Sequence, residues 1–346
     1  LLAGCVSDQY STTAVDQAAA QSDFVQVYNS IPMDSFKSHV KTLASDQFAG
    51  RAPASPGDKM TRDYLVNAFK EVGLQPGNNG SYLQQVDLLG ITSSVTKPLS
   101  IADISFESGK NYVVGSRRDN QSAQSLQNSP LVFVGYGINA PEYGWNDYAN
   151  VDVKGKTVVM LVNDPGYETA DSTLFEGKTM TYYGRWTYKY EEAARQGAAG
   201  AIIIHETGPA GYGWSVVANG WTGTQFHLPQ GKNAAPVVDV EMWIDLDKTT
   251  ALFSKAGLNF ADYKRKARQK GFKSVELGLK ASVAIESTLE QSVSYNIVAT
   301  LPGATHADEH VLYMGHVDHL GQNEALEGDQ IYNGAHDNAT GTAGLI

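Results

Sequence analysis

Short apolar segments alternate with helical segments between residues 129 and 272, and this alternation limits the fold more than any other feature. "PLVFVGYG" and "KTVVMLVNDPG" are short, rich in valine and bounded by glycine or proline, which is typical of buried strands. "YKYEEAARQGAAGAIIIHE" predicts a helix that passes through a glycine turn into a further strand. Strands that alternate with helices form α/β domains, so the sequence predicts an α/β fold with residues 129–272 as a module of its own.

The segments on either side of this module have helix and strand patterns too. In residues 31–128, "MDSFKSHVKTL" predicts a helix with Asp34 as its N-cap, and "DKMTRDYLVNAFKEV" predicts a second helix that ends at Gly73. The loop "GRAPASPGD" between them is predicted to be non-helical. In residues 273–346, "YNIVATL" and "HVLYM" are predicted strands.

Aromatic residues gather near the start of the helical segment inside the module. They are Tyr182, Tyr183, Trp186, Tyr188 and Tyr190. Such rings either pack in a core with their polar tips at the surface, or line a cleft. The sequence favours packing, and the cleft remains the alternative.

Charge and hydropathy exclude some classes of partner. The formal net charge is −11, and no cluster of Lys and Arg is long enough to follow a phosphate backbone, so we expect no nucleic-acid partner. No apolar run approaches the ~18 residues of a membrane span.

Residues 1–30 have a different character from the rest of the chain. "LLAGC" resembles the lipobox of bacterial lipoproteins, which implies a lipid attached at Cys5; the alternative is a chance cysteine. The polar stretch that follows is typical of a tether. Val6 after the cysteine resembles Gram-negative lipoproteins of the outer membrane. We therefore expect a periplasm-facing lipoprotein of the cell envelope, held to the membrane by its lipid.

The histidines and aspartates of "GHVDHLG" and "NGAHDNATG" are candidate metal ligands. Side chains two apart in an extended segment project to the same side, so His316 and Asp318 should point together, and Asp318 can orient the imidazole. Asp337 follows in a loop of small residues, and its two oxygens can bridge two metal ions. Imidazole and carboxylate ligands favour zinc. A buried hydrogen-bonded network is the alternative, and no Gly-x-Ser-x-Gly elbow supports a serine nucleophile.

The same run resembles the signature of the zinc-dependent aminopeptidases of metallopeptidase family twenty-eight, with aminopeptidase Y, glutamate carboxypeptidase and the transferrin receptor as relatives. "LASDQFAGRAPASPGD" is similar to the N-terminal segment of that family, and "VFVGYGINAPEYGWNDYANVDVKGKTVVM" is similar to its protease-associated domain. The resemblance implies a zinc-exopeptidase-like α/β/α domain with a protease-associated insertion over residues 129–272.

The resemblance also implies roles for particular residues. His316 matches a zinc ligand, Asp318 the catalytic aspartate that orients it, and Asp337 the carboxylate that bridges two zinc ions. Asn338 matches the residue after the bridge, where the family often has a cis peptide. His319 and His336 match no fixed role.

The function implied is that of an exopeptidase, most specifically an aminopeptidase, that acts on peptides through water activated by two zinc ions. We expect the general-base glutamate and the other ligands to lie beyond Ile346, because 273–346 resembles the front of a longer peptidase core. The 346-residue piece is then expected to be inactive. The alternatives are a receptor-like protein without catalysis and a glutaminyl cyclase.

The lipobox yields a testable prediction. Expressed with its signal peptide, the protein should partition into the detergent phase, and Cys5→Ser should move it to the aqueous phase because the only thiol that can carry the lipid is gone. Phase partitioning followed by immunoblotting measures this. Unchanged partitioning of the variant would contradict the lipid anchor.

Overall fold

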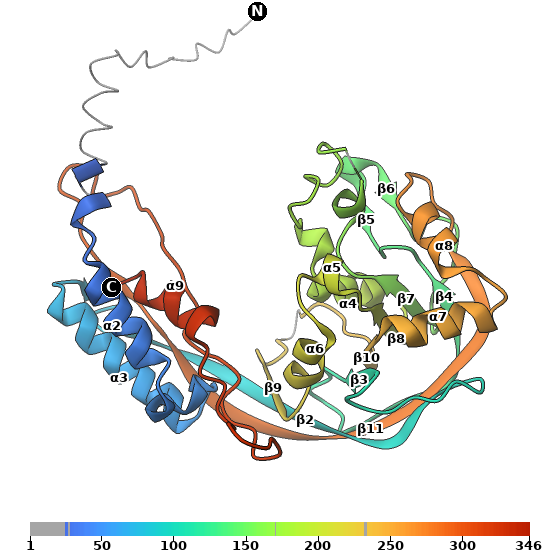
Figure 1. The fold of residues 1–346 in the computed structure, drawn as a ribbon, viewed down its shortest axis with the longest axis horizontal. Coiled ribbons are helices and arrows are strands. Elements are labelled where there is room, and N and C mark those ends of the chain that lie inside the picture. Colours follow the sequence, from blue (N-terminus) through green and yellow to red (C-terminus); the bar gives the residue numbers. More distant parts are fainter. Residues whose placement is uncertain (1–24, 27, 170, 232–233) are drawn as a thin grey trace, which may run out of the picture. The chain divides into compact units, whose positions relative to one another are not determined.

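The chain forms two compact units in a computed structural model that describes residues 25–26, 28–169, 171–231 and 234–346 (Figure 1). The larger unit is Gln85–Ser294, and the smaller unit joins the described residues up to Gln84 with Tyr295–Ile346. Cys5 and most of the predicted tether lie outside the described residues. None of the described helices has the length and apolar character needed to cross a bilayer.

The larger unit is built on a mixed eight-stranded sheet, so the predicted α/β class is confirmed. Its strands follow the order β3-β10-β8-β7-β4-β11-β2-β9. They are β2 (Leu83–Ile101), β3 (Tyr112–Gly115), β4 (Ala123–Phe133), β7 (Thr157–Leu161), β8 (Gly200–Ile204), β9 (Thr224–His227), β10 (Val240–Ile244) and β11 (Val275–Ile297). Neighbours from β10 to β4 pair in parallel, whereas β3, β11 and β9 pair antiparallel with β10, β4 and β2.

Helices cover both faces of the parallel strands, which explains why β7, β8 and β10 are buried along their whole length. Val159 and Leu161 pack into a core with Phe253 of α7 (Leu246–Lys255). Val158 faces the other way, into a second core with residues of α4 (Trp186–Arg195) and α6 (Trp214–Gly220). Side chains that alternate along each strand therefore pack into two separate cores, one on each face of the sheet.

Shorter elements complete the larger unit. They are the ribbon of β5 (Asn139–Ala140) and β6 (Trp145–Asn146), helices α5 (Thr207–Ala210) and α8 (Phe260–Ala267), and the 3₁₀ turns η2 (Pro141–Tyr143), η3 (Pro165–Glu168) and η4 (Tyr182–Gly184). Of the predicted aromatic cluster, Tyr188 and Tyr190 are packed in the two cores. Trp186 instead lines a cavity. Both interpretations of the cluster therefore apply, each to different residues.

The smaller unit brings the two ends of the described chain together. Its elements are α2 (Met33–Leu43), the 3₁₀ turn η1 (Asp46–Arg51), α3 (Pro56–Glu71), β1 (Gln75–Pro76), β12 (Ala299–Thr300), the π-helical turn η5 (Ala335–Ala339) and α9 (Thr340–Ala343). β1 pairs antiparallel with β12. Leu43, Phe48 and Leu65 form a small core with Ala339, and Val317 packs against it.

Two details of the predicted helices are wrong. Asp34 lies in the first turn of α2 and makes no capping bond, since the helix begins after Pro32. The "GRAPASPGD" loop is partly helical, because α3 begins at Pro56, where proline fits the first helical position, and Ser55 Oγ accepts from Asp58 N at 3.2 Å. The predicted end of α3 is confirmed, with Gly73 in the left-handed region at φ +82°.

The strand predicted at "HVLYM" is also wrong. Residues 310–314 have no strand structure, and Val311, Leu312, Tyr313 and Met314 are 76–83% exposed. A strand needs a neighbour to accept and donate its backbone hydrogen bonds, and no other described segment pairs with this one. By contrast, the predicted "YNIVATL" strands are confirmed in the end of β11 and in β12.

The predicted module 129–272 lies wholly inside the larger unit, and its boundary as a separate domain remains a prediction. The structure adds β2, β3 and β11 to it. β3 covers the outer side of β10 over four paired positions and is largely buried.

We expect a fragment of residues 85–294 to unfold in one cooperative thermal transition. A fragment of residues 129–272 should melt at a lower temperature, because it exposes the apolar edges that β3 and β11 cover. Calorimetry and circular dichroism of both fragments make the comparison. Equal melting temperatures would show that the flanking strands do not belong to the folding unit.

Candidate functional site

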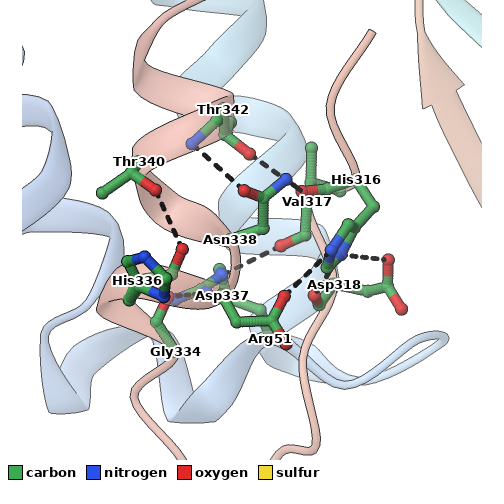
Figure 2. Close-up of polar contacts among 11 residues, drawn as sticks. Arg51, His316, Val317, Asp318, Gly334, His336, Asp337, Asn338, Thr340 and Thr342 are labelled. Carbon is green, nitrogen blue, oxygen red and sulfur yellow. Dashed lines mark hydrogen bonds and ion pairs between the residues drawn. The ribbon is translucent and has the colours of Figure 1, made fainter. Parts of the chain in front are cut away.

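The guanidinium of Arg51 holds together the backbone segments that carry the candidate site (Figure 2). Arg51 is 2% exposed. Its Nε donates to Val317 O at 2.9 Å, one Nη to Asn333 O at 2.7 Å and the other to Gly334 O at 2.9 Å. The Leu43 carbonyl accepts a further bond. One side chain thus links the end of α2, the 316–318 segment and the loop before Asp337.

The backbone around Arg51 is shaped to allow this approach. Gly50 and Arg51 both have positive φ, +65° and +53°. A Cβ on Gly50 would lie 2.2 Å from Gly321 O, so only glycine fits where the two segments touch. Gly321 N donates to Gly50 O at 2.9 Å, and His319 N donates to Arg51 O at 3.2 Å. These bonds align the two segments on either side of the guanidinium.

His316 and Asp337 face each other across this site. His316 Nε2 lies 3.0 Å from Asp337 Oδ1 (Figure 2). On the other side of the ring, Nδ1 lies 3.1 Å from the backbone oxygen of Asp318 and 3.6 Å from its carboxylate oxygen. A carbonyl oxygen can only accept, so the Nδ1 contact requires the proton on that nitrogen. The Asp337 carboxylate oxygen can only accept as well, so a proton or a cation has to lie between it and Nε2.

This arrangement fits a metal ligand pair in its donor chemistry. A free Nε2 lone pair beside a carboxylate oxygen is repulsive unless a proton or a cation lies between them. Two donors that bind one tetrahedral zinc ion at about 2.0–2.2 Å lie roughly 3.3–3.6 Å from each other, so the observed 3.0 Å separation would have to widen slightly to admit an ion. Both side chains are more than half exposed, so an ion would reach them from solvent. In the described part of the chain, no group of three or more His, Cys, Asp or Glu residues could hold a metal.

The backbone of His316 is fixed by the segment that carries Asp337. The His316 carbonyl accepts from Asn338 Nδ2 at 3.2 Å and from Thr342 Oγ1 at 3.0 Å. Asn338 Oδ1 in turn accepts from Gly341 N at 3.2 Å. The Asp337–Asn338 peptide bond is cis, the isomer that the resemblance implied. The Asn338 side chain therefore ties the backbone of His316 to the segment that carries Asp337.

The other histidines of the region lie outside this pair. Burial lowers the pKa of His319, and its ring lies edge-on to Tyr332 with the ring centroids 6.4 Å apart. The His336 carbonyl accepts from Thr340 Oγ1 at 2.8 Å. Sequence reasoning did not identify Arg51 or Thr342 as supports of the site. For Arg51 the only signal was the stretch "LASDQFAGR", which contributed to the family resemblance.

Comparisons with known proteins find a family match for the segment that carries the candidate site. Residues 296–346, which contain His316, Asp318 and Asp337, match the profile of "Peptidase family M28". The similarity to this peptidase family therefore covers the C-terminal segment that carries the candidate site. A search of curated proteins found no match.

Solved structures that resemble the chain come from several bacteria. An aminopeptidase from Aneurinibacillus sp. strain AM-1 is 18% identical, with a TM-score of 0.41 over 90% of this chain and 56% of that one. A peptidase M28 precursor from Shewanella amazonensis SB2B is 18% identical, with a TM-score of 0.43 over 90% and 58%. A zinc aminopeptidase from Bacillus subtilis is 13% identical, with a TM-score of 0.35 over 89% and 54%. The chain thus spans about half the length of these proteins.

We expect Arg51→Met to lower the free energy of unfolding of the 346-residue chain by about 2–4 kcal/mol. Carbonyls left buried without a donor cost about 1–3 kcal/mol each, and part of that cost is relieved by water entering the gap. Urea denaturation measures the change. Lys59→Ala, which breaks an exposed ion pair in the same unit, is the control and should have no clear effect. An Arg51 variant as stable as the control would show that the guanidinium does not hold the site.

Proposed function

We propose that His316 and Asp337 are zinc ligands of an exopeptidase, most specifically an aminopeptidase that releases N-terminal residues from peptides. The observation that carries this proposal is the 3.0 Å approach of His316 Nε2 to Asp337 Oδ1, with Nδ1 engaged on the opposite side of the ring. The match of residues 296–346 to peptidase family M28 supports hydrolysis of peptides as the reaction. Bound zinc would supply a nucleophilic water and polarise the scissile carbonyl.

The residues of this chain would prepare the site for that chemistry. His316 presents Nε2 because its backbone is held by Asn338 and Thr342. Asp337 has its carboxylate largely exposed, which leaves the second oxygen able to bind a second ion in the complete gene product. Asp318 is proposed as the carboxylate that orients His316 when its oxygen closes the present 3.6 Å distance to Nδ1.

The surrounding architecture is part of the same proposal. Residues 31–128 and 273–346 would contribute to an α/β/α peptidase domain, with 129–272 as its protease-associated insertion. The parallel strands β4, β7, β8 and β10 with helices on both faces are compatible with an α/β insertion. A lipid on Cys5 would place the enzyme in the cell envelope, where peptides are its substrates.

Substitutions in the complete gene product test the metal assignment. Asp337→Ala should weaken both zinc ions together, because one carboxylate would bind both, whereas His316→Ala should chiefly weaken one. Asp318→Asn should retain most of the metal and lower activity by about 10–100-fold. Metal analysis and hydrolysis of aminoacyl-nitroanilides measure these effects.

The 346-residue chain offers a second measurement. With only two of the proposed ligands, it should bind zinc weakly and hydrolyse no aminoacyl-nitroanilide. His336→Ala is a matched control, since it removes a neighbouring imidazole for which the described contacts give no hydrogen bond or ion pair to His316 or Asp337, and it should leave zinc binding unchanged. A complete gene product that keeps two zinc ions and full activity after Asp337→Ala would disprove the assignment. One that binds no zinc at all would favour the receptor-like alternative.

A further inference from the structure

The larger unit contains a cavity of about 270 Å³ that has no role in the proposed chemistry. Its walls come from both end strands of the sheet, β3 and β9, from their neighbours β10 and β2, and from helix α6. The lining is mainly apolar and aromatic. It includes Val114, Trp186, Tyr212, Val217, Trp221 and Trp243.

Indole rings give the cavity much of its shape. The ring centroids of Trp186 and Trp221 are 6.4 Å apart, and the planes are tilted by 57°. A Cβ on Gly115 would lie 3.3 Å from the Trp221 ring, so the absence of a side chain in β3 makes room for that indole. Trp186 is 39% exposed, although it is large and apolar. A partly exposed indole at the wall of a cavity is a surface on which another flat ring can stack.

The polar groups of the wall balance one another in charge. Arg117 Nε lies 2.7 Å from Glu241 Oε1, and the Glu241 side chain is 2% exposed. Burial, helped by Arg117, lowers the pKa of His227 to about 4, so this ring is neutral at pH 7. A charged ligand would lose its hydration without meeting an uncompensated opposite charge. The cavity therefore favours an uncharged ligand.

Two donors of the wall favour a ligand that carries an acceptor. Among the described residues, Arg117 Nη2 and Trp243 Nε1 are buried and have no hydrogen-bond partner. Arg117 and Trp243 both line the cavity, so a ligand that enters it is a source of the acceptor that these buried donors lack. A carbonyl oxygen beside an apolar ring would satisfy them.

Size and position narrow the choice further. A cavity of about 150 Å³ is enough for a benzene ring, so this one has room for a phenyl or indole group with an adjoining peptide unit. β9 is the last strand of the sheet, and Gln225 and His227 from it line the cavity. An extended peptide beside such a strand can place every second side chain on one face.

We infer that this cavity binds an uncharged aromatic side chain of a peptide or protein segment, together with a neighbouring backbone carbonyl. The site is formed by residues of the larger unit alone. It does not depend on zinc, and its test does not use peptidase activity.

Titration of the 346-residue chain with N-acetyl-phenylalaninamide tests the inference. This probe has no indole, so tryptophan fluorescence of the cavity can follow its binding. We expect saturable binding of this probe. N-acetyl-lysinamide and N-acetyl-glutamate amide should bind at least about tenfold more weakly. Absence of saturable binding, or equal binding of the charged amides, would overturn the inference.

Substitution of Gly220 shows whether the ligand occupies this cavity. No atom lies within 4 Å of a Cβ on Gly220, so Gly220→Phe can fill the space without straining the end of α6. It should weaken binding by about tenfold or more, whereas Gly231→Phe, an equally open position outside the cavity, should not. Val216→Trp, at a half-exposed lining position, is a second blocking variant if Gly220→Phe does not fold. Full binding by a folded blocking variant would also overturn the inference.

Discussion

The smaller unit depends on one buried cation. Arg51 brings a guanidinium into a region with a modest apolar core and satisfies it with backbone carbonyls from α2 and from the two segments near His316 and Asp337. Burial lowers the pKa of Arg51, and the carboxylates of Asp318 and Asp337 oppose that change. A planar, forked donor set suits this task, because several carbonyls at fixed angles can be bound at once. The facing pair of the site rests on this connection.

The two units are stabilised by different physics. In the larger unit, parallel strands buried on both faces bring apolar side chains into two cores, and hydrophobic burial is the main favourable contribution. In the smaller unit, side chain to backbone hydrogen bonds position loops that have little regular structure of their own. Precise placement of polar groups is what a metal site needs, and a network of this kind supplies it.

The two candidate ligand sites differ in the same way. The His316–Asp337 pair is exposed, polar and suited to a cation. The cavity near Trp186 and Trp221 is apolar, neutral and suited to an aromatic group. Each site is formed by residues of one unit, so an experiment that disproves one proposal does not affect the other.

The sequence predicted the α/β class, the strands β4, β7 and β8 and the helices α2 and α3, because these follow from local periodicity. It also singled out His316, Asp318 and Asp337, because their spacing and their family resemblance are both properties of short segments.

Only the tertiary structure showed that the Asp318 carbonyl is the nearer partner of His316 Nδ1. Only the tertiary structure joined Arg51 to Val317, and it left "HVLYM" outside any sheet. It alone placed strands from the two ends of the sheet order around one cavity. The physical reason is that periodicity reports how a segment meets its own neighbours, whereas these contacts join segments far apart in the chain, and their geometry exists only once the chain has folded.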